Sequence, residues 1–363
     1  MITTTTSSPV PEEPIGDSPW VTFGKAIFLI PLNILIICGN ILVIVAILKF
    51  KRLRQRISNY FILSLGVADL LVGIIVVPFA ATYSLLGYWP FGSIFCNIHA
   101  SFDVSLCTSS ILNLCAISLD RYLAIRSPLL YHSRMTGCRA IAMIAVTWSA
   151  GFMFFIPINI GAYKAQGFEW LYEEPTICQL VMNTTFALVA VTLSFYIPLL
   201  VIIFTYSYIF KIAHSQAVKI ADMEQTGANL NLEDSQSTRG GITKQKRRLK
   251  SERKAIKAVG LVVGIFLLCW LPFFIVYPTD ALCRCVVEMV YNVVMWIALM
   301  NSAINPFIYA FNDDFRYAFL TLLCCNKKRW LTGSSDAPPS QIPSGPSTIN
   351  DKPIFTVSHG NNR

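Results

Sequence analysis

Apolar residues run in seven long stretches along this chain of 363 residues, and short polar segments separate them. A helix that crosses a bilayer needs about 20 mostly apolar residues, and each stretch reaches that length. The pattern therefore predicts seven membrane-spanning helices, over residues 24–48, 58–84, 94–120, 138–161, 184–210, 256–278 and 286–310.

The composition agrees with a chain that lies mostly in lipid. Hydrophobic residues make up 54% of the sequence and charged residues 13%, whereas soluble domains carry about 25% charged residues. The predicted fold class is an all-α membrane protein, a seven-transmembrane helix bundle with a short amphipathic eighth helix. Its predicted parts are a disordered N-terminus (1–23), the bundle (24–310) with a polar loop at about 212–251, the amphipathic helix (311–325) with Phe315 and Phe319 on one face, and a disordered tail (326–363).

Basic residues in the short loops predict the orientation of the bundle. The segment Lys49–Arg56 carries five Lys or Arg and no acid, and Lys211–Lys257 carries eleven against five acids, whereas residues 81–92 carry none. Loops rich in Lys and Arg stay in the cytoplasm, so we expect the N-terminus outside the cell and the C-terminus inside. The net charge of +9 belongs to these loops, and we do not expect nucleic-acid binding.

Two carboxylates inside the spans, Asp69 and Asp103, are costly in lipid and therefore predict function. Asp103 precedes Arg121 by eighteen residues, about 27 Å of helix, which places it in the outer half of the third span. A carboxylate open to the outside among aromatic rings suits a protonated amine; a transport or proton-relay role is the alternative. The neighbours expected around Asp103 are Val104, Cys107, Trp270, Phe273 and Phe274.

Three prolines are predicted to interrupt spans five, six and seven. Pro198, Pro272 and Pro306 each remove a backbone donor and leave a carbonyl free. They supply hinge points for a switch that tilts helices.

Cysteines on the predicted outer side are candidates for disulfides. Cys96 at the head of span three and Cys178 in the second outer loop form the expected pair. Cys283 and Cys285 also lie outside, but a bridge across one residue is tight and their pairing stays open.

Two modifications are predicted from position. Cys324 and Cys325 follow the amphipathic segment at the inner face and suit palmitoylation. Asn183-Thr184-Thr185 is a glycosylation sequon on the outer side.

Several motifs stand in order along the predicted spans. They are Gly39-Asn40, Leu65-Gly66-Val67-Ala68-Asp69, Asp120-Arg121-Tyr122, Trp148, Phe266-x-x-Cys269-Trp270-Leu271-Pro272 and Asn305-Pro306-Phe307-Ile308-Tyr309. With this topology the chain resembles the rhodopsin-like G-protein-coupled receptors over about residues 24–325. Asp103 and Trp296 resemble the marks of biogenic-amine receptors. The stretches 87–92, 110–115 and 309–316 are most similar to the dopamine receptors that raise cyclic AMP, and 251–255 is also similar to trace-amine and octopamine receptors.

The resemblance implies a role for each matching residue. A biogenic amine would contact Asp103, Val104, Cys107, Thr108, Ser194, Trp270, Phe273, Phe274 and Trp296. A sodium ion, the one cofactor implied and an allosteric one, would lie among Asp69, Ser110, Asn301 and Ser302. The activation switch would comprise Asp120, Arg121, Tyr122, Tyr206, Glu252, Ile111, Pro198, Phe266, Asn305, Pro306 and Tyr309. A heterotrimeric G protein, of the stimulatory type, would contact Arg121 and Leu129. A receptor kinase and arrestin are further expected partners, and the plasma membrane is the expected location.

Two departures from the amine-receptor pattern keep the ligand open. Ala190, Val191 and Ser194 stand where catecholamine receptors present several serines, and Leu299 replaces a tyrosine that supports the aspartate. A catechol with unpaired hydroxyls loses affinity. Trace amines, octopamine and serotonin are therefore alternatives, as is an orphan receptor with constitutive activity.

Two rival classes of protein make different demands on the sequence. A secondary transporter usually carries internal repeats, and we find none. An intramembrane enzyme needs a His or Cys cluster or a Ser/His pair within the spans, but the four histidines lie at or beyond span ends: His99, His132, His214 and His359.

Overall fold

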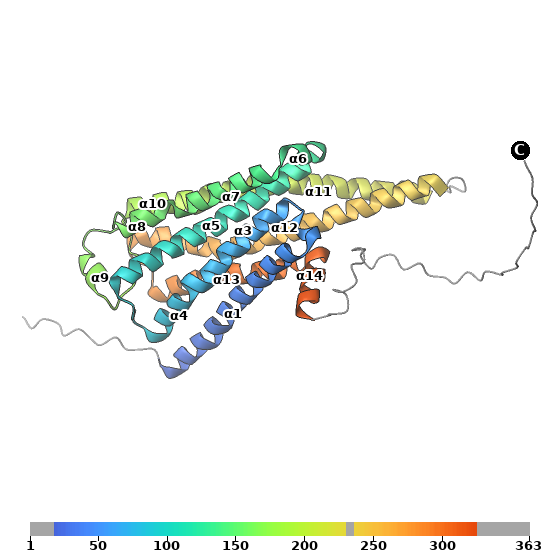
Figure 1. The fold of residues 1–363 in the computed structure, drawn as a ribbon. Helices are drawn as coiled ribbons and strands as arrows, with labels where there is room; N and C mark the ends of the chain where they lie inside the picture. Colours follow the sequence, from blue (N-terminus) through green and yellow to red (C-terminus); the bar gives the residue numbers. More distant parts are fainter. Residues whose placement is uncertain (1–17, 230–235, 325–363) are drawn as a thin grey trace, which may run out of the picture. The chain divides into compact units, whose positions relative to one another are not determined.

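All seven predicted spans are helical in the computed structural model (Figure 1). The structure describes residues 18–229 and 236–324. Within these ranges it describes the backbone alone, without the side chain, at residues 128, 129, 132, 213, 214, 216–229 and 236–259. The first span is α1 (Pro19–Lys49), the third α5 (Gly92–Arg126), the sixth α12 (Gln236–Cys283) and the seventh α13 (Glu288–Tyr309). The second comprises α3 (Ser58–Leu71), η1 (Val72–Val76) and α4 (Val77–Leu86). The fourth comprises α7 (Gly137–Gly151), η2 (Phe152–Phe154) and α8 (Phe155–Asn159), and the fifth α10 (Thr184–Val191), η3 (Thr192–Tyr196) and α11 (Ile197–Asn229).

In the described part of the chain, four shorter helices lie between or after the spans. They are α2 (Lys51–Arg54), α6 (Pro128–Arg134), α9 (Glu169–Glu173) and α14 (Asp313–Leu323). Figure 1 shows α9 at one end of the helical bundle and α6 and α14 at the other. Within the described ranges the only strand-like feature is a bridge between Lys164 and Met182.

Length and hydropathy agree with a protein that crosses a membrane several times. Among the described residues, six helical spans are long and apolar enough to cross a bilayer, and α13 passes the same test together with α14, from which it is bent by 96°. Polar residues such as Asn301 and Ser302 make α13 less apolar than the other spans.

The segment predicted as a loop at about 212–251 is mostly helical, which corrects that prediction. Helix α11 continues to Asn229 and α12 already begins at Gln236. Ala, Gln, Met and Glu are frequent between residues 213 and 225, and these residues favour helix. At the other end of the chain, α1 begins at Pro19, inside the segment 1–23 that was predicted to be disordered.

The prolines act differently from one another, and the prediction that each interrupts its span is wrong for two of them. A π-helical segment, η3, lies directly before α11, whose second residue is Pro198. The same arrangement recurs at Pro78, where η1 precedes α4. A π turn accommodates the missing donor and the bulk of the ring. In contrast, α12 runs unbroken through Pro272, and α13 runs unbroken through Pro306.

Helix α5 is the central element and contacts the second, fourth and fifth spans. Its approach to α7 is very close at Gly151, where an added Cβ would lie 1.9 Å from the Ser109 hydroxyl and 2.9 Å from the Ser105 carbonyl oxygen. Only glycine allows this approach, so Gly151 fixes the distance between the two helices.

The eighth helix, α14, is amphipathic as predicted. Phe315 and Phe319 are buried on one face, and the Asn312 side chain caps the first turn by accepting from the Asp314 amide at 3.0 Å. The Asp314 carboxylate pairs with Arg52 at 3.2 Å and Arg56 at 2.7 Å. These ion pairs join α14 to the first inner loop.

Candidate functional site

Asp103 lies three turns into α5 and keeps part of its surface exposed. The Cys107 thiol donates to its Oδ1 at 3.3 Å, one turn further along the helix. Among the described side chains, no Lys or Arg pairs with this carboxylate. A carboxylate in this position, without a cation from the protein, is suited to bind a cation that comes from outside.

Aromatic rings of α12 form the wall predicted beside this carboxylate. The ring of Phe274 lies 5.7 Å from that of Trp270 and 5.3 Å from that of Phe273. Trp270 and Phe274 are buried in the same core cluster against which Cys107 packs. The aromatic wall therefore lies against the same helix face as Asp103.

Sequence reasoning missed two tyrosines that extend this wall outward. Tyr277 stacks on Phe273 with ring centroids 5.5 Å apart, and Tyr291 of α13 lies 5.9 Å from Phe273. Helical spacing was the sequence signal that could have identified them. Tyr277 lies one turn beyond Phe273, and Tyr291 lies two turns before Ala298.

The remaining predicted ligand contacts are distributed over three helices. Val104 packs in an apolar cluster that includes Ala190 of α10. Thr108 and Ser194 are buried on α5 and η3. Trp296 lies in a second cluster with Leu299, and Cys107 packs against that cluster as well.

The fully buried carboxylate of Asp69 is held by three donors from two other helices. Ser110 of α5 and Ser302 of α13 each donate to Oδ1 at 2.9 Å, and Asn305 of α13 donates to Oδ2 at 2.8 Å. Asn305 thus belongs to the polar cluster around Asp69 as well as to the predicted switch. The Asn301 side chain is buried, and its amide nitrogen has no partner among the described residues.

At the inner end of α5, Asp120 connects the helix to the second inner loop. Its Oδ2 lies 3.2 Å from the Arg121 guanidinium, and its Oδ1 accepts from the Tyr131 hydroxyl of α6 at 2.6 Å. Burial and this bond to Asp120 raise the pKa of Tyr131 to about 12. The hydroxyl therefore keeps its proton at physiological pH and remains a donor.

The other residues of the predicted switch lie in the core between spans three, five, six and seven. Ile111 and Phe266 share one buried cluster, and Pro198 is buried on α11. The Tyr206 and Tyr309 hydroxyls are buried, and the Tyr122 hydroxyl accepts from Arg126 at 2.8 Å. The side chains of Glu252 and Leu129 lie outside the described residues.

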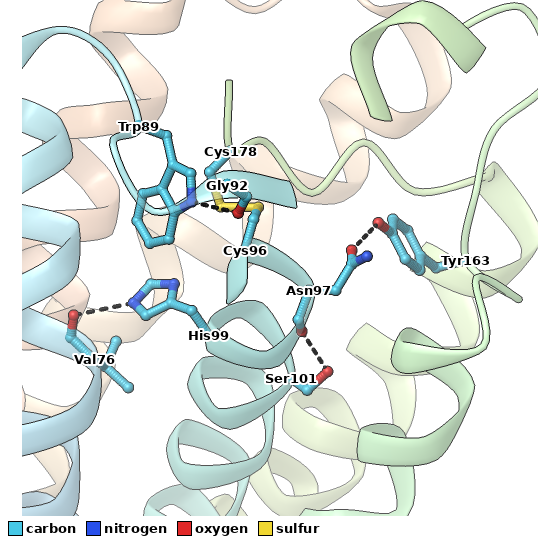
Figure 2. The surroundings of a disulfide bond; sticks show 9 residues. All are labelled: Val76, Trp89, Gly92, Cys96, Asn97, His99, Ser101, Tyr163 and Cys178. Atoms are coloured by element: carbon cyan, nitrogen blue, oxygen red, sulfur yellow. Dashed lines mark hydrogen bonds between the residues drawn. A yellow bond between two sulfur atoms is a disulfide. The ribbon is translucent and has the colours of Figure 1, made fainter. Parts of the chain in front are cut away.

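The predicted disulfide between Cys96 and Cys178 is present (Figure 2). Around it, Trp89 donates from its indole nitrogen to the Gly92 carbonyl at 2.9 Å, and His99 contacts the Val76 carbonyl at 3.2 Å. Figure 2 shows the disulfide beside Trp89, at the start of α5.

The second outer pair, left open from the sequence, also forms a disulfide, between Cys283 and Cys285. Cys324 is a free, exposed thiol at the end of α14, as palmitoylation requires, whereas Cys325 lies outside the described residues.

The Asn183 side chain, where glycosylation is predicted, makes hydrogen bonds within the protein. Its amide nitrogen lies 3.1 Å from the Ala162 carbonyl oxygen and 3.0 Å from that of Tyr163, while its Oδ1 caps α10 at the Phe186 amide. The glycosylation of Asn183 stays a prediction.

Comparison with known proteins assigns this architecture to a class. Residues 39–309 match the family described as "7 transmembrane receptor (rhodopsin family)", and the chain belongs to this family. It is a multi-pass membrane receptor and not an enzyme, which confirms the family predicted from the motifs.

Similar proteins within the family are dopamine receptors of the D1 type. The chain is 38% identical to the D(1A) dopamine receptor of Xenopus laevis, over 82% of this chain and 72% of the relative. It is also 38% identical to the D(1) dopamine receptor of Carassius auratus, over 83% and 88%. The D(1)-like dopamine receptor of Takifugu rubripes is again 38% identical, over 80% and 67%. The predicted similarity to dopamine receptors is thereby confirmed.

Proposed function

We propose that this receptor binds an extracellular biogenic amine at Asp103 and activates the stimulatory G protein, which raises cyclic AMP. The observation that carries the proposal is the partly exposed Asp103 carboxylate, which no described Lys or Arg neutralises and which lies beside the aromatic wall of α12. An ammonium ion would gain both a charge partner and cation–π attraction there. The similarity to dopamine receptors supports the same class of ligand.

The fifth span favours an aromatic amine with a single ring hydroxyl. Ser194 is the one hydroxyl among the three positions that catecholamine receptors use, because Ala190 and Val191 are apolar and buried. A second hydroxyl of a catechol would face these side chains without a partner, which costs affinity.

On the inner side, Arg121 is the proposed docking residue for the G protein, together with Leu129. The Asp120 carboxylate pairs with the Arg121 guanidinium and so holds this side chain in place. Release of that pair, with Tyr206 and Tyr309 moving into the space, is the proposed active state. The amine shifts this equilibrium only through its higher affinity for the active state.

Asp69, Ser110, Ser302 and Asn301 are the proposed sodium site. One carboxylate and neighbouring hydroxyl and amide oxygens are the hard donors that such a cation prefers, and their burial between three helices makes the site sensitive to helix movement. A bound sodium ion would neutralise the Asp69 carboxylate and favour the inactive state.

We further propose that the receptor lies in the plasma membrane with its N-terminus outside. The basic loops on the side of α2 and α14 support this orientation. A receptor kinase and arrestin are proposed partners of the inner face.

The test is cyclic AMP in cells that express the chain, exposed to a panel of aromatic amines and to neutral analogues in which a hydroxyl replaces the amine. We expect at least one amine to raise cyclic AMP and its neutral analogue to be inactive. An equal response to the neutral analogue would refute an ionic contact to the ligand. A response in another pathway only would refute the proposed coupling.

A further inference from the structure

The turn between α12 and α13 has an unusual backbone at Arg284. Its φ of 50° makes it the one residue other than glycine with positive φ in the part of the chain that the structure describes. Its amide donates to the Asp280 carbonyl at 2.8 Å, which closes the last turn of α12. Glycine or asparagine usually takes this position because a larger side chain is strained there. An arginine at this point therefore suggests that its side chain has a function.

The Arg284 side chain reaches the second outer loop, about a hundred residues earlier in the chain. Its Nη2 donates to the Met182 carbonyl oxygen at 2.6 Å, and the guanidinium lies over the Phe168 ring at 5.2 Å. A charge-assisted hydrogen bond and a cation–π contact thus hold the same side chain.

Residues 178–182, which we name the outer strap, are fixed at both ends. Cys178 is bonded to Cys96 of α5, and the Met182 carbonyl is bonded to Arg284. Figure 2 shows the first anchor beside the start of α5.

The outer strap packs directly against the proposed ligand site. Met182 is buried in an apolar cluster, and Leu180, Val104 and Tyr277 pack against the same cluster. Val104 follows Asp103 in the chain, and Tyr277 extends the aromatic wall. Movement of the outer strap therefore changes how far the residues around Asp103 are covered from the outer side.

We propose that Arg284 is a clasp that holds the outer strap over the ligand site and limits how fast a cation reaches Asp103. Release of the guanidinium from Met182 and Phe168 frees one end of the strap, while the disulfide keeps the other end in place. The clasp sets the rates of ligand association and dissociation together. The inference rests on the proposed function in one respect, that ligands approach Asp103 from the outer side.

The test measures access without any amine. The probe is a trimethylammonium-bearing methanethiosulfonate reagent added outside, and the readout is the rate at which it modifies Cys107, the residue bonded to Asp103. Cys107→Ser identifies the labelled site by peptide mass spectrometry. We expect Arg284→Ala to raise this rate about tenfold, the effect of one charged hydrogen bond.

Arg284→Lys is the matched control, because it keeps the positive charge, the Cβ at positive φ and a donor for Met182. We expect its labelling rate to stay within about threefold of the wild-type rate, since it loses the planar contact with Phe168 but keeps the ionic hydrogen bond. If Arg284→Ala does not reach the cell surface, Phe168→Ala serves instead, and we expect it to raise the labelling rate of Cys107 about two- to threefold.

Equal labelling rates in wild type and Arg284→Ala would overturn the clasp, even if the variant were less heat-stable, because a purely structural arginine changes stability alone. A thiol that donates to a carboxylate reacts slowly, so if neither protein is labelled, the ligand kinetics decide: unchanged association and dissociation rates in Arg284→Ala would overturn the clasp. Association and dissociation of tritiated tyramine, which has the single ring hydroxyl favoured by the fifth span, give the second readout. Both rate constants should rise about tenfold in Arg284→Ala, with their ratio nearly unchanged.

The two proposals fail in different ways. Faster labelling without any amine response leaves the clasp intact and refutes the amine receptor. An amine response with unchanged labelling refutes the clasp alone.

Discussion

Asn305 donates a hydrogen bond from Nδ2 to Oδ2 of Asp69 at 2.8 Å, across 236 residues of chain. The other carboxylate oxygen accepts from Ser110 and Ser302, so Asp69 connects the second, third and seventh spans. A buried carboxylate with three donors is stable only while all three helices keep their places. A shift of α13 relative to α3 must therefore break at least one of these bonds.

Asp69→Asn should abolish the effect of sodium on agonist affinity. In the wild type, 150 mM sodium should weaken agonist binding several-fold relative to a large organic cation, because sodium favours the inactive state. The neutral amide is nearly the same size but attracts no cation, so the variant should bind agonist equally in both salts. Agonist competition binding on membranes measures this. A sodium effect that persists in Asp69→Asn would place the ion elsewhere.

Gly151→Ala should destabilise the receptor. The new methyl would overlap the Ser109 hydroxyl and touch the Ser105 carbonyl, and overpacking of this kind costs about 1–3 kcal/mol. The melting temperature of the detergent-solubilised receptor should fall by several degrees. Gly24→Ala is the control, because its Cβ meets nothing within 4 Å and alanine is the better helix former. Equal melting temperatures for Gly151→Ala and the wild type would contradict the close contact of α5 with α7.

The seven spans could be predicted from the length of their apolar stretches, but the ends of the helices could not. Each span contains enough apolar residues to be recognised alone. The extension of α11 and α12 beyond the membrane carries no apolar signal, and residues 212–251 looked like a loop for that reason. The π segment before Pro78 depends on how the backbone relaxes around one ring, which periodicity does not encode.

The candidate site was predictable where a motif or a buried charge marked it. Asp69 and Asp103 were visible as carboxylates in apolar helices. Tyr277 and Tyr291 were missed because a tyrosine near the end of a span is ordinary. Arg284 was missed because its role depends on a backbone angle and on a carbonyl in a distant loop.

Ala190→Ser should raise the potency of catecholamines selectively. Ala190 is buried in the cluster against which Val104 packs, next to Asp103, so a hydroxyl there could pair with a second ring hydroxyl. The concentration of dopamine needed for half-maximal cyclic AMP should fall about tenfold, the effect of one hydrogen bond. Tyramine, with one ring hydroxyl, should change little. Equal shifts for both amines would argue against ring recognition by the fifth span.

Tyr131→Phe should increase basal signalling. The hydroxyl is the donor that α6 offers to Asp120, and its loss leaves a buried carboxylate oxygen without that partner, which costs about 1–3 kcal/mol. The conformation that holds Arg121 is thereby destabilised. Cyclic AMP without ligand, normalised to surface receptor, should rise several-fold. Unchanged basal signalling at equal surface expression would show that this bond does not favour the inactive state.

The central claim is that the Asp103 carboxylate binds the amine, and an isosteric neutral variant tests it most directly. Cyclic AMP should be measured against amine concentration for wild type, Asp103→Asn and Asp103→Glu at matched surface expression. We predict that Asp103→Asn shifts the half-maximal concentration upward by about a hundredfold or more, the effect of losing a charged partner in a partly buried site, and that Asp103→Glu shifts it less. A curve for Asp103→Asn that overlays the wild type would contradict the account.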